Sequence, residues 1–191
     1  QAHFYLPRRY RDPFGQSAFV DFDAHDLLMV ETRDALNNRF TVDANDYRVL
    51  QPRLVSDPNR NRTAVAFDTL GMVVSTAVMG KPLPAPAEGD SLAGFVTDLT
   101  QAQLAGFFDA ADPHATAAAL LKDATTRIVY DLDRFQRTRQ ANPADPTKWQ
   151  PACAATLARE THVHSPLPPH GLKIQISFSY SDGFGREIQK K

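Results

Sequence analysis

The sequence has little cysteine, little glycine and no excess of charge of either sign. Cys153 is the single cysteine among 191 residues, which excludes an internal disulfide and a cysteine-based metal cage. The 21 Lys and Arg residues balance 22 Asp and Glu residues, so the chain lacks the basic surface that nonspecific nucleic-acid binding needs. No apolar run approaches the roughly 20 residues that span a bilayer. We therefore expect no nucleic-acid partner and no direct membrane insertion.

The N-terminal residues, QAHFYLPRRYRDPFG, contain no apolar core of the kind found in a secretory signal, and the chain does not begin with Met. We therefore expect a processed product or an excerpt from something longer. The length is enough for one domain, or a large piece of one, with a buried core.

Proline marks the turns and loops of this sequence more often than glycine does, with 14 prolines against 9 glycines. In residues 81–97, Pro82, Pro84 and Pro86 alternate with other residues, which favours an extended, polyproline-like path. We interpret 81–97 as a proline-rich linker or surface loop. Residues 139–152 hold three more prolines and the only tryptophan, and we expect a polar loop there.

Short segments of β-branched and aromatic residues alternate with turn residues over the first 80 positions. No helical segment between them could serve as a βαβ crossover, so the spacing predicts successive antiparallel hairpins. The expected strands are 19–22, 27–31, 40–42, 48–50, 63–67 and 72–78 in this part, and 125–131, 156–163 and 172–180 later.

A helical insertion is expected within residues 98–123. Thr100 can cap a helix that runs through Leu104 and Phe108. Asp112 can cap a second helix, with Pro113 at its first position and an alanine-rich stretch to Leu121. The fold class is therefore mainly β, with repeated antiparallel hairpins forming a curved sheet strip and a small helical insertion.

Turns headed by aspartate recur through the sequence at near-regular spacing. The turns at 12–16, 34–38 and 57–61 are separated by 22 and 23 residues, and aromatic-plus-Asp pairs lie between them. The aspartate can accept N–H groups two or three residues on, and Gly or Asn later in the turn tolerates positive φ. The expected structural turn residues are Asp12, Gly15, Asp34, Asn38, Asp57, Asn61, Asp68, Asp131, Asp182, Gly185 and Arg186.

Aromatic residues occupy a similar place in each hairpin, at Phe22, Tyr47, Phe67 and Tyr130. We expect each ring to stack on its counterpart in the next hairpin, so that successive hairpins bury a continuous face. Such a sheet strip can be extended indefinitely.

These Tyr/Asp units resemble the Rhs/YD repeats of bacterial polymorphic toxins. Longer strings resemble the C-terminal half of the B component of insecticidal toxin complexes: NDYRVLQP at 45–52, VAFDTLGMV at 65–73, AVMGK at 77–81, ATTRIVYD at 124–131 and FSYSDGFGREIQKK at 178–191. The resemblance covers essentially the whole chain. It divides the chain into Rhs/YD-like hairpins at 1–80, the linker at 81–97, the insertion at 98–123 and further Rhs/YD-like β structure at 124–191, all within one larger shell.

The resemblance implies a secreted, non-enzymatic segment of shell wall. In that family the Rhs region of the B component joins that of the C component to form a hollow β-shell around the toxic C-terminal region of the C component. The implied partners are the C component, the rest of the parent B component and, indirectly, the pore-forming A component. The alternative from another class is a cell-surface YD-repeat module that binds carbohydrate or protein.

Several residues have the spacing or residue types of a metal or catalytic site, but the sequence lacks the other residues that such a site needs. His162 and His164 have metal-ligand spacing without an evident third ligand. Asp21, Asp23 and Asp26 lack the pattern of a calcium loop and fit solvated turn carboxylates.

Ser179, Ser181 and Cys153 lack a nucleophile elbow and a nearby histidine. We therefore expect no catalytic residue, no cofactor and no metal. Phe107 and Phe108 fit a face that packs the insertion onto the sheet. Trp149 is the candidate for contact with another part of a larger assembly.

Overall fold

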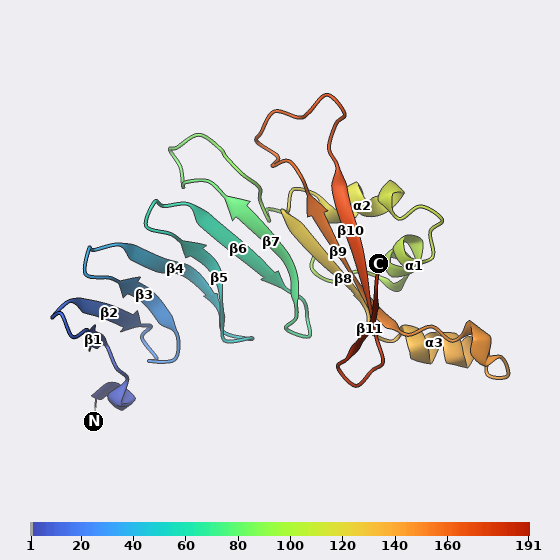
Figure 1. Ribbon diagram of the computed structural model, residues 1–191, viewed down its shortest axis with the longest axis horizontal. Coiled ribbons are helices and arrows are strands. Elements are labelled where there is room, and N and C mark those ends of the chain that lie inside the picture. Colours follow the sequence, from blue (N-terminus) through green and yellow to red (C-terminus); the bar gives the residue numbers. More distant parts are fainter. Residues whose placement is uncertain (1) are drawn as a thin grey trace.

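A computed structural model describes residues 2–191, which form one antiparallel sheet of eleven strands in the order of the chain (Figure 1). Three α-helices accompany the sheet, so the mainly β fold with a helical insertion is confirmed. None of the helices formed by these residues has the length and apolarity that crossing a membrane requires. The elements are η1 Ala2–Tyr5, β1 Arg9–Arg11, β2 Ser17–Phe22, β3 Met29–Arg33, β4 Arg39–Asp46, β5 Gln51–Ser56, β6 Arg62–Phe67, β7 Val73–Met79, α1 Gln101–Phe108, α2 His114–Leu121, β8 Thr126–Asp131, α3 Arg134–Ala141, η2 Pro146–Lys148, β9 Ala152–Arg159, β10 Ile174–Ser181 and β11 Glu187–Lys190.

The helices gather at the C-terminal part of the strip (Figure 1). Helices α1 and α2 pack on β8–β10, and the hydrophobic core lies between these two layers. Phe107 is fully buried and stacks on Phe178 with ring centroids 6.0 Å apart, which confirms the expected packing of the insertion onto the sheet. The core residues are Phe107, Ala117, Leu120, Leu121, Ala124, Val129, Ala155 and Leu157.

The register defines two faces of the sheet, because paired residues in an antiparallel sheet point to the same side. We call the side that carries Arg127, Val129 and Leu157, beneath the helices, the helix-side face. The side that carries Ile128 and Thr156 is the open face. Nothing in the described part of the chain forms a second layer over the open face.

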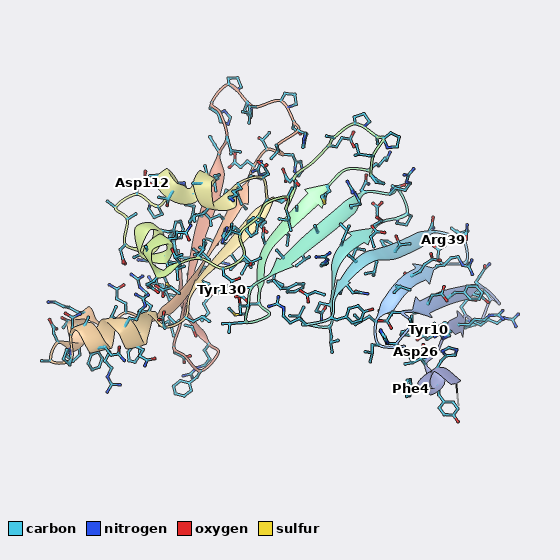
Figure 2. All side chains as sticks on the ribbon, turned by 180° about the vertical axis from the view of Figure 1, so that it is seen from behind. Phe4, Tyr10, Asp26, Arg39, Asp112 and Tyr130 are labelled. Atoms are coloured by element: carbon cyan, nitrogen blue, oxygen red, sulfur yellow. The ribbon has the colours of Figure 1, made fainter. Side chains whose placement is uncertain are left out.

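The N-terminal strands form a single layer. Residues 3–67 include no buried residue, and Asp68 is the first along the chain. Seen from behind, strands β1–β6 carry side chains on both sides without a covering helix (Figure 2). In this part the sheet is held by its backbone hydrogen bonds and by contacts between neighbouring strands rather than by a core.

Local sequence explains the helical insertion. Thr100 accepts the backbone N–H of Gln103, and the Gln103 side chain accepts the N–H of Thr100, which completes a capping box. Asp112 accepts the N–H of His114 at 3.0 Å, but Pro113 occupies the N-cap of α2 and not its first helical position, so this cap lies one residue later than expected. Arg127 ties the insertion to β8 by donating to the carbonyls of Leu120 and Val96, each at 2.9 Å.

Two expected segments are wrong. Residues 48–50 form a turn and not a strand: Asp46 accepts the Arg48 N–H at 2.9 Å, Leu50 has φ 54°, and β5 begins at Gln51. The loop expected at 139–152 begins inside α3, which extends to Ala141.

Two other segments are shifted or shaped differently. Strand β9 lies at 152–159 and not at 156–163, since its alanines pair with β8 and β10 on both sides and this tertiary context outweighs their weak strand preference. The proline-rich segment does not follow a straight extended path, because the Ala85 N–H donates to the Pro82 carbonyl at 3.3 Å and closes a turn.

Candidate functional site

The aspartates that head the hairpin turns accept backbone N–H groups with their side chains. The donors are two and four residues on, and not two or three, as at Asp34, whose Oδ1 accepts from Leu36 and Asn38 at 2.9 and 2.8 Å. The contact four residues on recurs from Gln16 to Asp12, Leu27 to Asp23, Asn61 to Asp57, Met72 to Asp68 and Arg186 to Asp182, at 2.8, 2.9, 2.7, 2.8 and 3.3 Å.

The fourth residue of each turn adopts the left-handed conformation. Its φ is 85° at Gly15, 83° at Gly71 and 80° at Gly185, but also 66° at Asn37 and 70° at Arg60. The expectation that Asn38 and Asn61 take positive φ is therefore wrong by one position. Both are fifth residues, and a left-handed fourth residue turns the fifth N–H back toward the aspartate.

The fifth residue often donates to the aspartate a second time, through its side chain. Asn38 donates to Asp34 at 2.7 Å and Arg186 to Asp182 at 2.6 Å. The Asn38 side chain lowers the pKa of Asp34, and the Phe184 N–H is the main cause that lowers the pKa of Asp182. Hydrogen bonds to the charged form favour it, so these turns hold ionised aspartates at their heads.

The repeat aromatics do not stack on one another. Within residues 2–191, no ring pair joins any two of Phe22, Tyr47, Phe67 and Tyr130; the ring partner of Tyr47 is His25. The two tyrosines use their hydroxyls instead. Tyr47 donates to Asp23 Oδ2 at 2.7 Å, and Tyr130 donates to the Val73 carbonyl at 3.0 Å. The Tyr47 contact raises the pKa of Tyr47 and lowers that of Asp23.

Neighbouring turns along one rim of the sheet are thereby linked. The Tyr47 contact joins the β4–β5 turn to the β2–β3 turn. Arg48 Nη1 then donates to the Asp68 carbonyl at 2.6 Å, and the Thr69 N–H donates to Asp98 Oδ1 at 3.0 Å. These contacts fasten each hairpin to the next at its turn, beyond the strand pairing itself.

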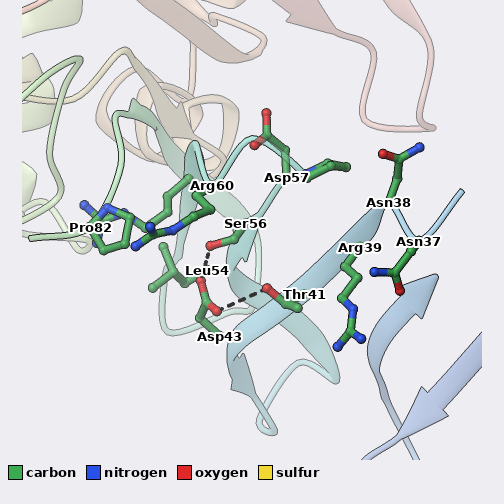
Figure 3. Close-up of a pocket in the computed structure, with 12 residues that line it drawn as sticks. Asn37, Asn38, Arg39, Thr41, Asp43, Leu54, Ser56, Asp57, Arg60 and Pro82 are labelled. Atoms are coloured by element: carbon green, nitrogen blue, oxygen red, sulfur yellow. Dashed lines mark hydrogen bonds between the residues drawn. The ribbon is translucent and has the colours of Figure 1, made fainter. Parts of the chain in front are cut away.

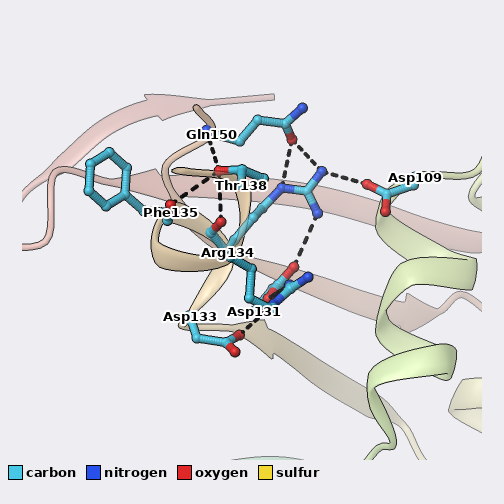
Figure 4. Close-up of polar contacts among 8 residues, drawn as sticks. Asp109, Asp131, Asp133, Arg134, Phe135, Thr138 and Gln150 are labelled. Atoms are coloured by element: carbon cyan, nitrogen blue, oxygen red, sulfur yellow. Dashed lines mark hydrogen bonds and ion pairs between the residues drawn. The ribbon is translucent and has the colours of Figure 1, made fainter. Parts of the chain in front are cut away.

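Asp131 does not head a hairpin turn. It is 1% exposed at the end of β8, where its carboxylate pairs with Arg134 at 3.1 Å and Arg137 at 2.5 Å (Figure 4). Arg134 also reaches Asp109, the C-cap residue of α1, at 2.7 Å and Gln150 Oε1 through Nε at 2.7 Å. This cluster fixes the start of α3 against α1 and the sheet.

The two histidines are used within the fold. His162 Nδ1 lies 2.7 Å from Asp90 Oδ2, and His164 Nδ1 lies 3.0 Å from the Gly89 carbonyl. The buried Asp90 carboxylate also accepts from the Thr125 hydroxyl and the Val163 N–H. Among the residues that the structure describes, no group of three or more His, Cys, Asp or Glu could hold a metal ion.

Cys153 and Trp149 also have intramolecular surroundings. Burial raises the pKa of the Cys153 thiol to about 11, which keeps it protonated and unreactive at neutral pH. Trp149 is half-buried, donates its indole N–H to the Asn142 carbonyl at 2.9 Å and meets the Phe135 ring edge-on at 6.0 Å.

The other polar candidates belong to turns and strand pairs. Asp23 heads the β2–β3 turn, and Asp26 pairs with Arg8 at 2.5 Å. Ser179 donates to Glu187 of β11 at 2.5 Å, and Ser181 accepts the Gly183 N–H at 3.1 Å.

The hollow in Figure 3 has a volume of about 610 Å³ and lies on the helix-side face between Arg39 and Arg60. Asp43 accepts from Ser56 at 2.5 Å and from Thr41 at 3.4 Å within it. The hydroxyls of this hollow are thus engaged by a carboxylate that stabilises a bulge of β4. They serve the sheet.

No family model and no curated protein sequence matches the chain. Solved structures do. The crystal structure of TcdB2-TccC3 is 22% identical, with a TM-score of 0.66 over 99% of this chain and 8% of that one. The crystal structure of TcdB2-TccC3 without its hypervariable C-terminal region is 18% identical, with a TM-score of 0.66 over 91% and 10%. A Tc holotoxin pore of Photorhabdus luminescens is 19% identical, with a TM-score of 0.61 over 91% and 10%.

This chain therefore spans a tenth or less of the chains it is similar to. At these identities the likeness establishes the fold: a strip of antiparallel sheet found within large toxin-complex chains.

Proposed function

We propose that this chain is a stretch of wall in the Rhs/YD-type β-shell of the B component of a secreted insecticidal toxin complex. The shell encloses the toxic C-terminal region of the partner C component until the complex delivers it into a host cell. The segment contributes structure and no catalysis. The rest of the parent B component continues the wall, and the pore-forming A component is an indirect partner.

The observation that carries this proposal is the single-layer strip itself. Residues 3–67 hold no buried residue, yet their strands continue in one unbroken antiparallel order into the helix-covered part. A wide, meandering sheet that has no hydrophobic core over most of its width is suited to enclosing a volume and unsuited to forming a compact domain. Likeness over 99% of the chain to TcdB2-TccC3 supports the same interpretation.

Protease protection of the partner tests the proposal. The C component is produced with and without the parent polypeptide, treated with proteinase K, and its C-terminal region is followed by immunoblot. We expect protection only in the assembly. Equal digestion in both samples would contradict enclosure.

A variant of this segment tests its part in the wall. Val129→Asp places a carboxylate in the core beneath the helices, where Val129 is 1% exposed, and is expected to open the assembly to the protease. Phe184→Asp, at an exposed turn, is the matched control and should leave protection intact. Size-exclusion chromatography shows whether each variant still assembles, and a Val129→Asp assembly with full protection would argue against a wall role for this segment.

A further inference from the structure

The two faces of the strip differ sharply in charge. On the helix-side face, paired positions of β2–β9 include charged residues in nearly every strand: Asp21, Glu31, Arg33, Arg39, Arg62, Arg127, Asp131 and Arg159. On the open face, the paired positions of β2–β10 outside the bulges carry none. They are Ala18, Val20, Thr32, Phe40, Val42, Val55, Thr63, Val65, Thr76, Val78, Thr126, Ile128, Tyr130, Ala152, Ala154, Thr156, Ala158, Gln175, Ser177, Ser179 and Ser181.

The neutral residues form continuous rows across the sheet. Val42, Val55, Thr63 and Val78 are successive partners in β4–β7. Thr76, Thr126, Ala158 and Gln175 continue a second row through β7–β10. Charges border this surface at two places. Arg53 lies at a bulge of β5 where the pairing skips a residue, and β11 brings Lys190 opposite Ser179 and Glu187 into a hydrogen bond with the Ser179 hydroxyl.

This neutral surface is accessible in the chain. None of its residues is buried, and Phe40 and Val78 are 51% and 46% exposed. A hollow of about 700 Å³ lies over Phe40, Val55 and Val78. The charged residues Asp57, Arg62 and Glu88 also line it. Over β8–β10, helices α1 and α2 cover the helix-side face. An enclosed polypeptide can therefore approach the sheet there only from the open face.

We propose that the open face is the inner surface of the shell and that it contacts the enclosed C-terminal polypeptide of the partner. This inference rests on the proposed function. The paired positions of β2–β10 on this face offer a passenger no ion pairs, so contact with them depends on methyl and hydroxyl groups that suit any sequence. One of the similar structures is described as being without its hypervariable C-terminal region, and a partner segment that varies in sequence suits a wall that selects for no charge.

Site-specific photocrosslinking in the assembled parent polypeptide and partner tests this assignment. The photoreactive residue p-benzoylphenylalanine replaces Thr63 or Ser177 on the open face, and Thr41 or Arg33 on the helix-side face as matched controls. All four are half-buried or exposed. We expect at least about fivefold more adduct with the partner's C-terminal region from the open-face positions.

The other outcomes separate the inference from the function on which it rests. Adducts from the helix-side positions alone overturn the assignment of faces and leave enclosure standing. Adducts between two copies of the parent polypeptide, from the open face, assign that face to self-association and overturn the inference. Absence of passenger adducts from all four positions overturns the inference when the passenger stays protease-resistant, and overturns enclosure as well when it is digested.

Introducing positive charge on the open face tests why its neutrality matters. Thr63→Lys with Ser177→Lys is expected to slow release of an acidic passenger at least about threefold relative to a basic one, because new ion pairs form along the wall. The matched pair Ala64→Lys with Ala66→Lys, at half-buried positions of β6 on the helix-side face, should leave both passengers unaffected. Equal release of the two passengers from the open-face variant would contradict the inference.

Discussion

At the scale of single residues, the fourth position of the Asp-led turn decides how the hairpins close. Gly15, Gly71 and Gly185 take the left-handed conformation easily, whereas Asn37 and Arg60 are held in it. Asparagine tolerates this region better than most residues, because its short polar side chain can hydrogen-bond to the nearby backbone, whereas arginine gains no such local hydrogen bond. Arg60 is therefore the most strained of these turn residues.

Replacing Arg60 is expected to stabilise the chain. Arg60→Gly should raise the free energy of unfolding by about 0.5–1 kcal/mol, because the left-handed conformation disfavours a side chain by more than glycine's extra freedom in the unfolded state offsets. Gly71→Ala should lower it by about 1–3 kcal/mol, since a Cβ there would lie 2.8 Å from Val49 Cγ1. Urea unfolding measures both.

The control for Arg60→Gly is Asn59→Gly, one residue earlier in the same turn. Asn59 does not adopt positive φ, so added chain freedom should make this variant less stable than the parent by about 0.5 kcal/mol. Stabilisation by Asn59→Gly equal to that of Arg60→Gly would show that loop flexibility, and not the fourth position, governs the effect.

At the scale of elements, α3 is attached by charge and not by an apolar face. Arg134 is buried and Arg137 is partly buried, and both converge on Asp131. The helix sequence RFQRTRQA presents few apolar residues, so the hydrophobic periodicity that reveals α1 is missing here. The contact between α3 and the sheet therefore depends on a buried carboxylate.

Removing that carboxylate should destabilise the junction. Asp131→Ala leaves the buried guanidinium of Arg134 without its buried counter-charge and is expected to lower the free energy of unfolding by about 3 kcal/mol. Asp133→Ala removes an exposed partner of Arg137 and should change it by less than about 1 kcal/mol. Thermal and urea unfolding of both variants compare the two, and equal losses would contradict the role given to Asp131.

At the scale of the whole molecule, stability is expected to be uneven along the strip. The core lies beneath α1 and α2, whereas β1–β6 contribute no buried residue. Local opening is easiest where few apolar contacts are lost. The N-terminal strands therefore depend on pairing with neighbouring strands more than the C-terminal strands do.

Hydrogen exchange of the isolated chain measures this gradient. Backbone amides of β8–β10 should be protected by at least about a hundredfold more than those of β2–β5, because opening the former exposes the core. Strand β5 is paired on both sides, whereas β1 is an edge strand. The amides of β5 therefore serve as the internal control for exchange that is fast only because a strand lies at the edge. Uniform protection across the strip would contradict a stability gradient set by the helical layer.

The sequence by itself determined the repeating hairpins, the capped helical insertion and the aspartate at the head of each turn, because these follow from interactions within about five residues. Thr100 and Asp34 act through neighbours along the chain. The one-residue error has a different source in each turn: the adjacent Asn37 and Asn38 do not show which of them takes positive φ, and Arg60 gives no sign of positive φ at all.

Only the tertiary structure decided what lies between distant segments. The place of β9 depends on its two neighbours, α3 depends on Asp109, Asp131 and Gln150, and Tyr47 reaches a turn 24 residues away instead of stacking on another ring. The contrast between a charged and a neutral face also emerges only from the register. Side chains alternate with period two within a strand, but bulges and pairing determine which residues of different strands share a side.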